Sequence, residues 1–203
     1  MKIMNKDFEK KLKNAIENGD VDFLQVHKGK YNINLTLADE DNDSLLDYAI
    51  SNNTNNIYKF FIDEGASLNN INDYGENIVH SVVYSKCSNR LLEISEIERV
   101  EINHRSNDGT TPLLLSVLLD DFELFKTLIE LGADTNIGDE NNNLPIHVAC
   151  QFGNLKIVDV LLNNGTNLFK KTDHGNLPLA LAVNENHVDI IKKLYLIMYD
   201  NTN

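Results

Sequence analysis

The feature of this sequence that most constrains its fold is a repeat period of about 33 residues. Turn-forming residues recur at Asn42, Gly75, Gly109, Asn142 and Gly175. A second, unrelated series of small residues recurs at Ala49, Val82, Ser116, Ala149 and Ala182. Both series step by 33, 34, 33 and 33 residues. This agreement predicts a stack of similar supersecondary units, each of which buries its apolar face against its neighbours.

Each period has the pattern of a turn followed by two antiparallel helices. Thr111 and Pro112 are typical of a helix start, because threonine caps exposed backbone amides and proline needs no hydrogen-bond partner in the first turn. Gly165 marks a helix end, where a positive φ is easiest for glycine. The helix before it carries apolar residues at helical spacing, namely Leu155, Val158, Leu161 and Leu162. One unit cannot bury this stripe alone, so neighbouring units must stack.

Several of these phrases resemble the ankyrin repeat. Residues 108–116 read Asp-Gly-Thr-Thr-Pro-Leu-Leu-Leu-Ser, and residues 128–136 read Leu-Ile-Glu-Leu-Gly-Ala-Asp-Thr-Asn. The ankyrin consensus carries Gly-x-Thr-Pro-Leu-His-x-Ala and later Leu-Leu-x-x-Gly-Ala-Asp. The resemblance implies an all-α fold, an ankyrin-repeat solenoid of stacked helix-turn-helix units with hairpin-like loops. It also implies a single domain over residues 1–203, with repeats near 7–38, 39–71, 72–105, 106–138, 139–171 and 172–203.

The third repeat departs from this pattern. Residues 91–102 lack the Gly-Ala phrase that should follow the second helix, and one extra residue precedes Asn103. We therefore expect a reshaped loop at this point. At the last repeat, Lys192, Lys193 and the polar residues 200–203 are typical of a capping repeat that faces water.

The charge of the chain favours some partners over others. It has 31 acidic and 18 basic residues and a net charge of −13. This field repels the phosphates of nucleic acids and anionic membranes and attracts a partner protein with a basic surface. The apolar stretches are too short to span a bilayer. We expect a cytoplasmic monomer that binds neither nucleic acid nor membrane.

The ankyrin resemblance implies binding through the hairpin tips and the solvent-facing side of each first helix, on a concave face. None of these positions in the five clear repeats is Lys or Arg. The acidic residues among them are Glu40, Asp41, Asp43, Asp73, Glu76, Asp108, Glu140, Asp173 and Glu185. The aromatic and apolar ones are Tyr74, Tyr84, Leu118, Leu119 and Phe152. Aromatic anchors within a charged rim are the usual anatomy of a protein interface.

A second interpretation of the same residues remains open. Aspartate and glutamate also suit turns and helix starts for purely local reasons. Leu118 and Phe152 could likewise belong in part to the core. The two interpretations differ in what the carboxylates contact.

No combination of residues indicates catalysis or metal binding. His80 and His147 occupy the column where the ankyrin consensus has histidine, which favours a structural hydrogen-bonding role. Cys87 and Cys150 stand far from any zinc-ligand pattern; Cys150 is expected to be buried in a helix and Cys87 to be a loop thiol. The acidic run 39–43 lacks the glycine and distal glutamate of a calcium loop, and no phosphate-binding loop is present. We predict no catalytic residue, no metal and no cofactor.

These observations predict a protein-binding module that acts by occupying its target, as an inhibitor, an immunity-type protein or a masking factor, because no second domain is recognisable. One alternative is an effector that acts on a host protein. Another is an adaptor or scaffold, with residues 91–102 as the second binding surface. An enzyme or metal protein is the third class, and no set of residues in the sequence supports it.

Overall fold

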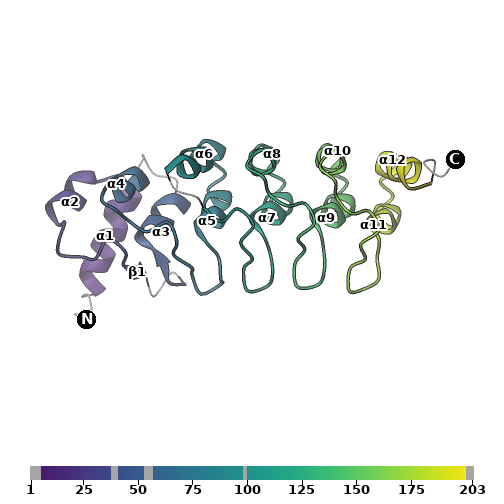
Figure 1. The fold of residues 1–203 in the computed structure, drawn as a ribbon. Coiled ribbons are helices and arrows are strands. Elements are labelled where there is room, and N and C mark those ends of the chain that lie inside the picture. Colours follow the sequence, from purple (N-terminus) through teal and green to yellow (C-terminus); the bar gives the residue numbers. More distant parts are fainter. Residues whose placement is uncertain (1–5, 38–40, 53–56, 98–99, 200–203) are drawn as a thin grey trace. The chain divides into compact units, whose positions relative to one another are not determined.

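A computed structural model describes residues 6–37, 41–52, 57–97 and 100–199 (Figure 1). Within these residues the chain forms twelve helices and two short strands. The helices are α1 (Lys6–Asn18), α2 (Val21–Val26), α3 (Leu45–Ser51), α4 (Ile57–Asp63), α5 (Ile78–Tyr84), α6 (Ser88–Ile97), α7 (Pro112–Leu118), α8 (Phe122–Glu130), α9 (Pro145–Phe152), α10 (Leu155–Asn163), α11 (Pro178–Asn184) and α12 (Val188–Tyr199). Strands β1 (Thr36–Leu37) and β2 (Asp43–Ser44) pair antiparallel, with Thr36 opposite Ser44 and Leu37 opposite Asp43.

The chain divides into two compact units, Met1–Val100 and Glu101–Asn203. In the first unit, α3 packs against both α1 and α5, and each of these helices is followed by its own second helix. In the second unit, α9 packs between α7 and α11, while α10 contacts both α8 and α12 (Figure 1). Each unit is thus a stack of helix pairs, which confirms the predicted all-α repeat fold.

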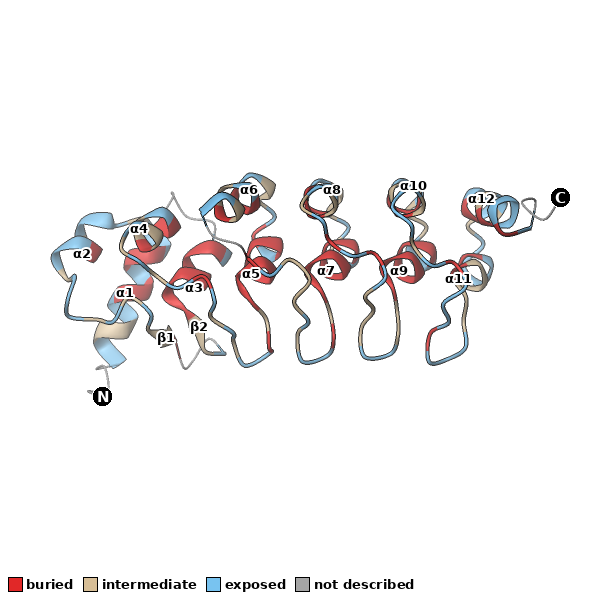
Figure 2. Ribbon diagram, in the orientation of Figure 1, coloured by how far each residue is buried: buried red, intermediate tan, exposed pale blue. Residues whose placement is uncertain are grey.

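The core of each unit lies mainly on the first helices. Figure 2 shows α3, α5, α7 and α9 as mostly buried. The second helices bury one stripe only. In α10 this stripe is Ile157, Val158 and Leu161, at the spacing expected of an amphipathic helix.

The predicted helix starts and structural histidines are confirmed. The Thr111 side chain accepts a hydrogen bond from Leu114 N at 3.2 Å, and Pro112 occupies the first turn of α7. His147 Nδ1 accepts from Leu144 N at 3.0 Å, and its Nε2 donates to the Lys170 carbonyl at 3.0 Å. Burial lowers the pKa of His147, which favours the neutral ring that this pair of hydrogen bonds requires.

Hydrogen bonds between backbones link the hairpin tips of successive repeats. In the first unit, Asp73 N donates to Asp41 O at 2.8 Å. In the second unit, Glu140 N donates to Asp108 O at 2.8 Å, and Asp173 N donates to Asn141 O at 2.9 Å. The same contact recurs within each unit because the turns recur with the sequence period.

The third repeat, which lacks the Gly-Ala turn, contacts the preceding repeat through a buried arginine side chain. Arg90, in α6, is almost fully buried. Its Nη1 donates to the Ile50 carbonyl at the end of α3 at 2.8 Å, and its guanidinium carbon lies 4.7 Å from the centre of the Tyr58 ring. The guanidinium thereby ties the irregular repeat to the one before it.

Candidate functional site

The predicted surface of tips and first helices is best defined in the first unit, around a turn with two left-handed residues. Asp41 and Asn42 have φ of 53° and 60°. The Asn42 side chain donates to both carboxylate oxygens of Asp73 at 2.9 Å. Tyr74 is exposed beside them, and the nearby charge of Asp41 is the first cause of a raised pKa for its hydroxyl. A raised tyrosine pKa reports the negative potential at this tip.

Behind the tip, one asparagine side chain joins two carboxylates. Asn72 Nδ2 donates to Asp43 Oδ1 at 2.9 Å and to Glu76 Oε2 at 3.2 Å. The Tyr84 hydroxyl donates to the other Glu76 oxygen at 2.8 Å. Burial raises the pKa of Asp43 to about 6, and the charges of Asp47, Glu76 and Asp41 add to the increase while the Asn72 hydrogen bond opposes it. The predicted residues Asp43, Glu76 and Tyr84 thus belong to one hydrogen-bonded chain.

The tips of the second unit show the same chemistry. Asp108 accepts hydrogen bonds from Ser106 Oγ at 2.6 Å and from Thr110 N at 3.0 Å, and the Ser106 bond is the first cause of a lowered pKa. Asp173 accepts from Asn142 Nδ2 at 2.6 Å. Glu140 is exposed at its tip, and Glu185 is exposed where α11 ends.

The contacts of the acidic residues separate those that are hydrogen-bonded from those that are simply exposed. Asp108 accepts a hydrogen bond within its own turn, as the local interpretation predicts. Asp73 and Asp173 instead accept from asparagines in the tip of the preceding repeat. Glu140 and Glu185 are exposed residues whose charge adds to the same surface. Glu40 lies outside the described residues.

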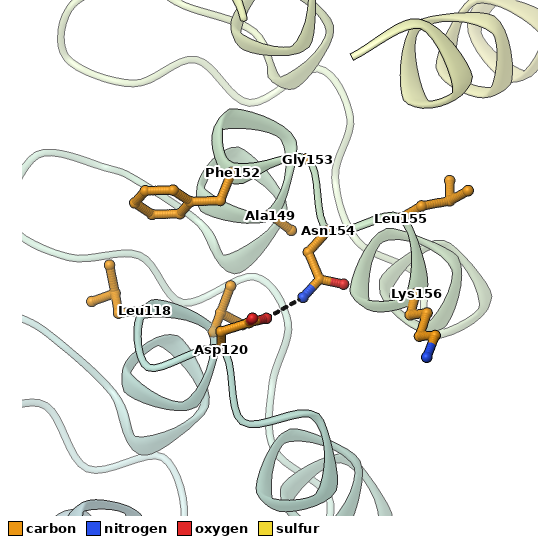
Figure 3. A pocket seen from close by; sticks show the side chains of 9 residues that line it. Leu118, Asp120, Ala149, Phe152, Gly153, Asn154, Leu155 and Lys156 are labelled. Atoms are coloured by element: carbon orange, nitrogen blue, oxygen red, sulfur yellow. Dashed lines mark hydrogen bonds between the residues drawn. The ribbon is translucent and has the colours of Figure 1, made fainter.

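Two apolar members of the predicted surface, Leu118 and Phe152, line a groove in the second unit. Leu118 and Phe152 are 46% and 64% exposed at the ends of α7 and α9, whereas Leu119 is half-buried. The groove has a volume of about 670 Å³ and is lined by Val117, Leu118, Asp120, Ala149, Phe152, Gly153, Asn154, Leu155 and Lys156. Figure 3 shows Phe152 and Leu118 on one side of it and Leu155 and Lys156 on the other.

Sequence reasoning missed the second wall of this groove. Leu155 and Lys156 begin α10, so the consensus pattern assigns them to the second helix and away from the predicted surface. The helical spacing of apolar residues predicts Leu155 in the apolar stripe of this helix, but the structure leaves it 36% exposed in the first turn, outside the buried stripe of Ile157, Val158 and Leu161. The groove itself depends on how the two helix pairs stack, which a single repeat does not reveal.

The second helices differ in charge balance from the tips. Lys59 in α4 pairs with Glu93 in α6 at 3.1 Å. Lys193 in α12 likewise pairs with Asp159 in α10. Glu93 and Asp159 on this side are thus balanced by lysines of a neighbouring repeat, whereas the predicted tip and first-helix positions include no lysine or arginine.

The buried cysteine of the second unit is shielded from reaction. Burial raises the pKa of the Cys150 thiol to about 12, which keeps it protonated and unreactive at neutral pH. Among the described residues, no group of three or more histidine, cysteine, aspartate or glutamate side chains could hold a metal ion. None of the helices described is long and apolar enough to cross a membrane.

Comparisons with known proteins identify the repeat family. The family model for ankyrin repeats (3 copies) matches residues 84–172 and 113–203. The chain is 31% identical over 161 residues to "Probable 26S proteasome regulatory subunit p28" of Saccharomyces cerevisiae, which covers 76% of this chain and 70% of that protein. It is 27% identical over 143 residues to phosphocholine transferase AnkX of Legionella pneumophila, covering 68% of this chain and 15% of that protein. It is 40% identical over 60 residues to NF-kappa-B inhibitor alpha of Gallus gallus, covering 30% of this chain and 19% of that protein.

Proposed function

Because this chain belongs to the ankyrin repeat family, whose repeats mediate protein–protein interactions, we propose that it is a cytoplasmic module that binds a partner protein with a basic surface. The partner lies against the tip surface, which we define as Asp41, Asp43, Asp73, Tyr74, Glu76, Tyr84, Asp108, Leu118, Leu119, Glu140, Phe152, Asp173 and Glu185. We further propose that the six repeats over residues 1–203 act as one array.

The observation that carries this proposal is the charge imbalance of the tip surface. The tip surface contains carboxylates but no lysine or arginine. On the second helices, by contrast, lysines pair with carboxylates of adjacent repeats. The raised pKa of Tyr74 beside Asp41 supports a negative potential at the tips. Such a potential attracts a basic partner and increases its rate of association.

The groove beside Leu118 and Phe152 supplies the apolar contact. Exposed aromatic and apolar side chains within a charged rim are where binding energy concentrates in protein interfaces. Phe152 stands out from α9 and can insert between side chains of a partner (Figure 3). We expect the acidic residues to set the speed and salt dependence of binding and the groove to set its lifetime.

A protein that binds through such a surface acts by covering part of its partner. A partner whose basic surface is covered loses access to other ligands, so we propose an inhibitor, an immunity-type protein or a masking factor. Two relatives carry names of this kind, a proteasome regulatory subunit and an NF-kappa-B inhibitor. Those names describe the relatives and support a regulatory role here.

The test compares two variants with equal loss of charge. Asp41→Asn, Glu140→Gln and Glu185→Gln remove three carboxylates from the tip surface. The control removes three exposed carboxylates from the second helices by Asp63→Asn, Glu96→Gln and Glu123→Gln. A partner captured from the native source by wild type and control, released by moderate salt and lost by the tip variant supports the proposal. Equal retention by both variants would refute it.

A second candidate function is an adaptor, including an effector that bridges host proteins. The observation that favours it is the exposure of Leu92 and Ile97 on α6, in the irregular third repeat. Leu92→Glu with Ile97→Glu should then release a partner that the tip variant retains. If both variants release the same partners, the adaptor role is wrong.

A further inference from the structure

The last repeat has an apolar end face that the other repeats bury. One column of the first helices contains Ile50, Val117, Cys150 and Val183. The first three are 0%, 4% and 0% exposed, whereas Val183 is 53% exposed. Among the described residues, each of the first three is followed in its own unit by another helix pair, and no such pair follows Val183. The following repeat is therefore what covers this column. Figure 2 shows the same loss of buried surface on α11.

The second helix of the last repeat continues this face. Ile191, Tyr195 and Tyr199 are four residues apart and so lie along one side of α12. The rings of Tyr195 and Tyr199 are both exposed, with centroids 5.0 Å apart. Lys193 reaches back to Asp159 in α10. Because Tyr195 follows Lys193 by two residues, it points about 200° around the helix, away from the preceding repeat.

The residues at equivalent positions in the other second helices confirm that this side of α12 faces away from the preceding repeat. Phe125 in α8 and Val158 in α10 occupy the column of Ile191, and both are fully buried. Ile191 is only half-buried in α12. The end face, which we define as Leu179, Val183, Ile191, Tyr195 and Tyr199, thus has the apolar character of a packed repeat interface. It departs from the water-facing cap expected from Lys192 and Lys193.

We propose that two copies of this chain associate through this end face, related by a two-fold axis, in place of the monomer expected from sequence. The face continues the interface that α9 and α10 already make with α11 and α12, so it is shaped to receive another helix pair. A second copy supplies such a pair with the same apolar side chains. Two-fold pairing of identical patches is the commonest way in which identical chains assemble.

Charge and the rest of the chain agree with this choice of partner. The charged residues of α12 have both signs, with Asp189 beside Lys192 and Lys193, so two copies do not meet as like-charged surfaces. Helix α1 in the first unit exposes Lys10, Lys11 and Asn14, which offer no apolar complement for head-to-tail stacking.

Sedimentation equilibrium of the full chain over a wide concentration range tests this proposal. Wild type should approach twice the 23.0 kDa mass of one chain and stop there. Val183→Lys with Tyr195→Lys should raise the dimer dissociation constant by about a hundredfold, because each substitution acts twice in a two-fold interface. The control, Leu118→Lys with Phe152→Lys, adds the same charge to exposed apolar positions of the same unit and should leave the dimer intact.

Circular dichroism should show all three proteins equally helical, since every substituted side chain is largely exposed. Hydrogen exchange in α11 and α12 should slow as the wild-type concentration rises. A particle of one-chain mass at every concentration would overturn the proposal. So would equal dissociation by both variants, or a size that keeps growing with concentration.

Discussion

Asn72 donates its side-chain amide to Asp43 Oδ1 at 2.9 Å, across two repeats and 29 residues of sequence. The same amide reaches Glu76, so two carboxylates share one donor. This arrangement does not compensate fully for the burial of Asp43, whose pKa rises from 3.8 to about 6. Asp43 is therefore a proton-binding group on the tip surface.

The first prediction concerns pH and stability. The folded chain holds the Asp43 proton at a higher pH than the unfolded chain does, so the free energy of unfolding should increase as pH falls through about 6 and level off below 3.8. Because Asp43 is partly exposed and solvent screens it, we expect an effect on the order of 1 kcal/mol. Urea unfolding of wild type and Asp43→Asn at about pH 7 and about pH 5 measures it.

Asp43→Asn should be more stable than wild type at neutral pH. Its free energy of unfolding should increase less than that of wild type as the pH falls towards 5. Asp108→Asn is the control, because the Ser106 hydrogen bond lowers the pKa of Asp108 and moves its titration below this range. An unchanged pH dependence in Asp43→Asn would mean that another group takes up the proton.

A second prediction separates the conformational from the steric role of glycine. Gly109 and Gly132 both have positive φ, at 81° and 88°. A Cβ on Gly109 would lie 2.7 Å from the backbone nitrogen of Glu140, whereas a Cβ on Gly132 would meet nothing within 4 Å. Gly132→Ala should cost about 1 kcal/mol from the left-handed conformation alone. Gly109→Ala should cost at least twice as much by urea unfolding, and equal costs would rule out crowding at this tip.

A third prediction concerns the buried cation of the third repeat. Arg90→Ala removes the donor to the Ile50 carbonyl and the contact with the Tyr58 ring. We expect a loss of about 3 kcal/mol in the free energy of unfolding, because a buried polar group then lacks its partner. Arg105→Ala is the control, since Arg105 is exposed and makes a long bond of 3.4 Å to Gly109 O. A similar small loss for both would show that Arg90 does not hold the repeat.

The groove yields a fourth prediction. Phe152→Ala should leave the melting temperature almost unchanged, because the ring is 64% exposed. Partner affinity should fall by roughly thirtyfold, the usual effect of removing an aromatic anchor. Titration calorimetry with the captured partner measures the affinity. Phe169→Ala removes another exposed aromatic ring from the same unit, away from the groove, and should bind as wild type does.

The two thiols provide a fifth prediction. Cys150 is buried and its pKa is about 12, whereas Cys87 is half-buried before α6. A thiol reagent at neutral pH should modify Cys87 in the folded chain and reach Cys150 only as the chain opens. Mass spectrometry of peptides identifies the modified residue. Modification of Cys150 at the same rate as Cys87 would contradict the packing of α9.

The sequence was sufficient to predict the repeats because their signals are local. A left-handed turn favours asparagine or glycine at Asn42 and Gly109, a helix start favours Thr111 with Pro112, and an amphipathic stripe follows from spacing along one helix. Each requirement involves residues within a few positions of one another. The period then places the units in order without any knowledge of their contacts.

The contacts between repeats could not be predicted in this way, because they join residues about 30 positions apart whose distance depends on how the helices stack. The pairing of Asn42 with Asp73, the raised pKa of Asp43 and the second wall of the groove at Leu155 all arise there. So does the exposure of Val183, a residue as apolar as its counterparts in the same column. Local pattern determines what each repeat is made of, whereas burial and electrostatics depend on what packs against it.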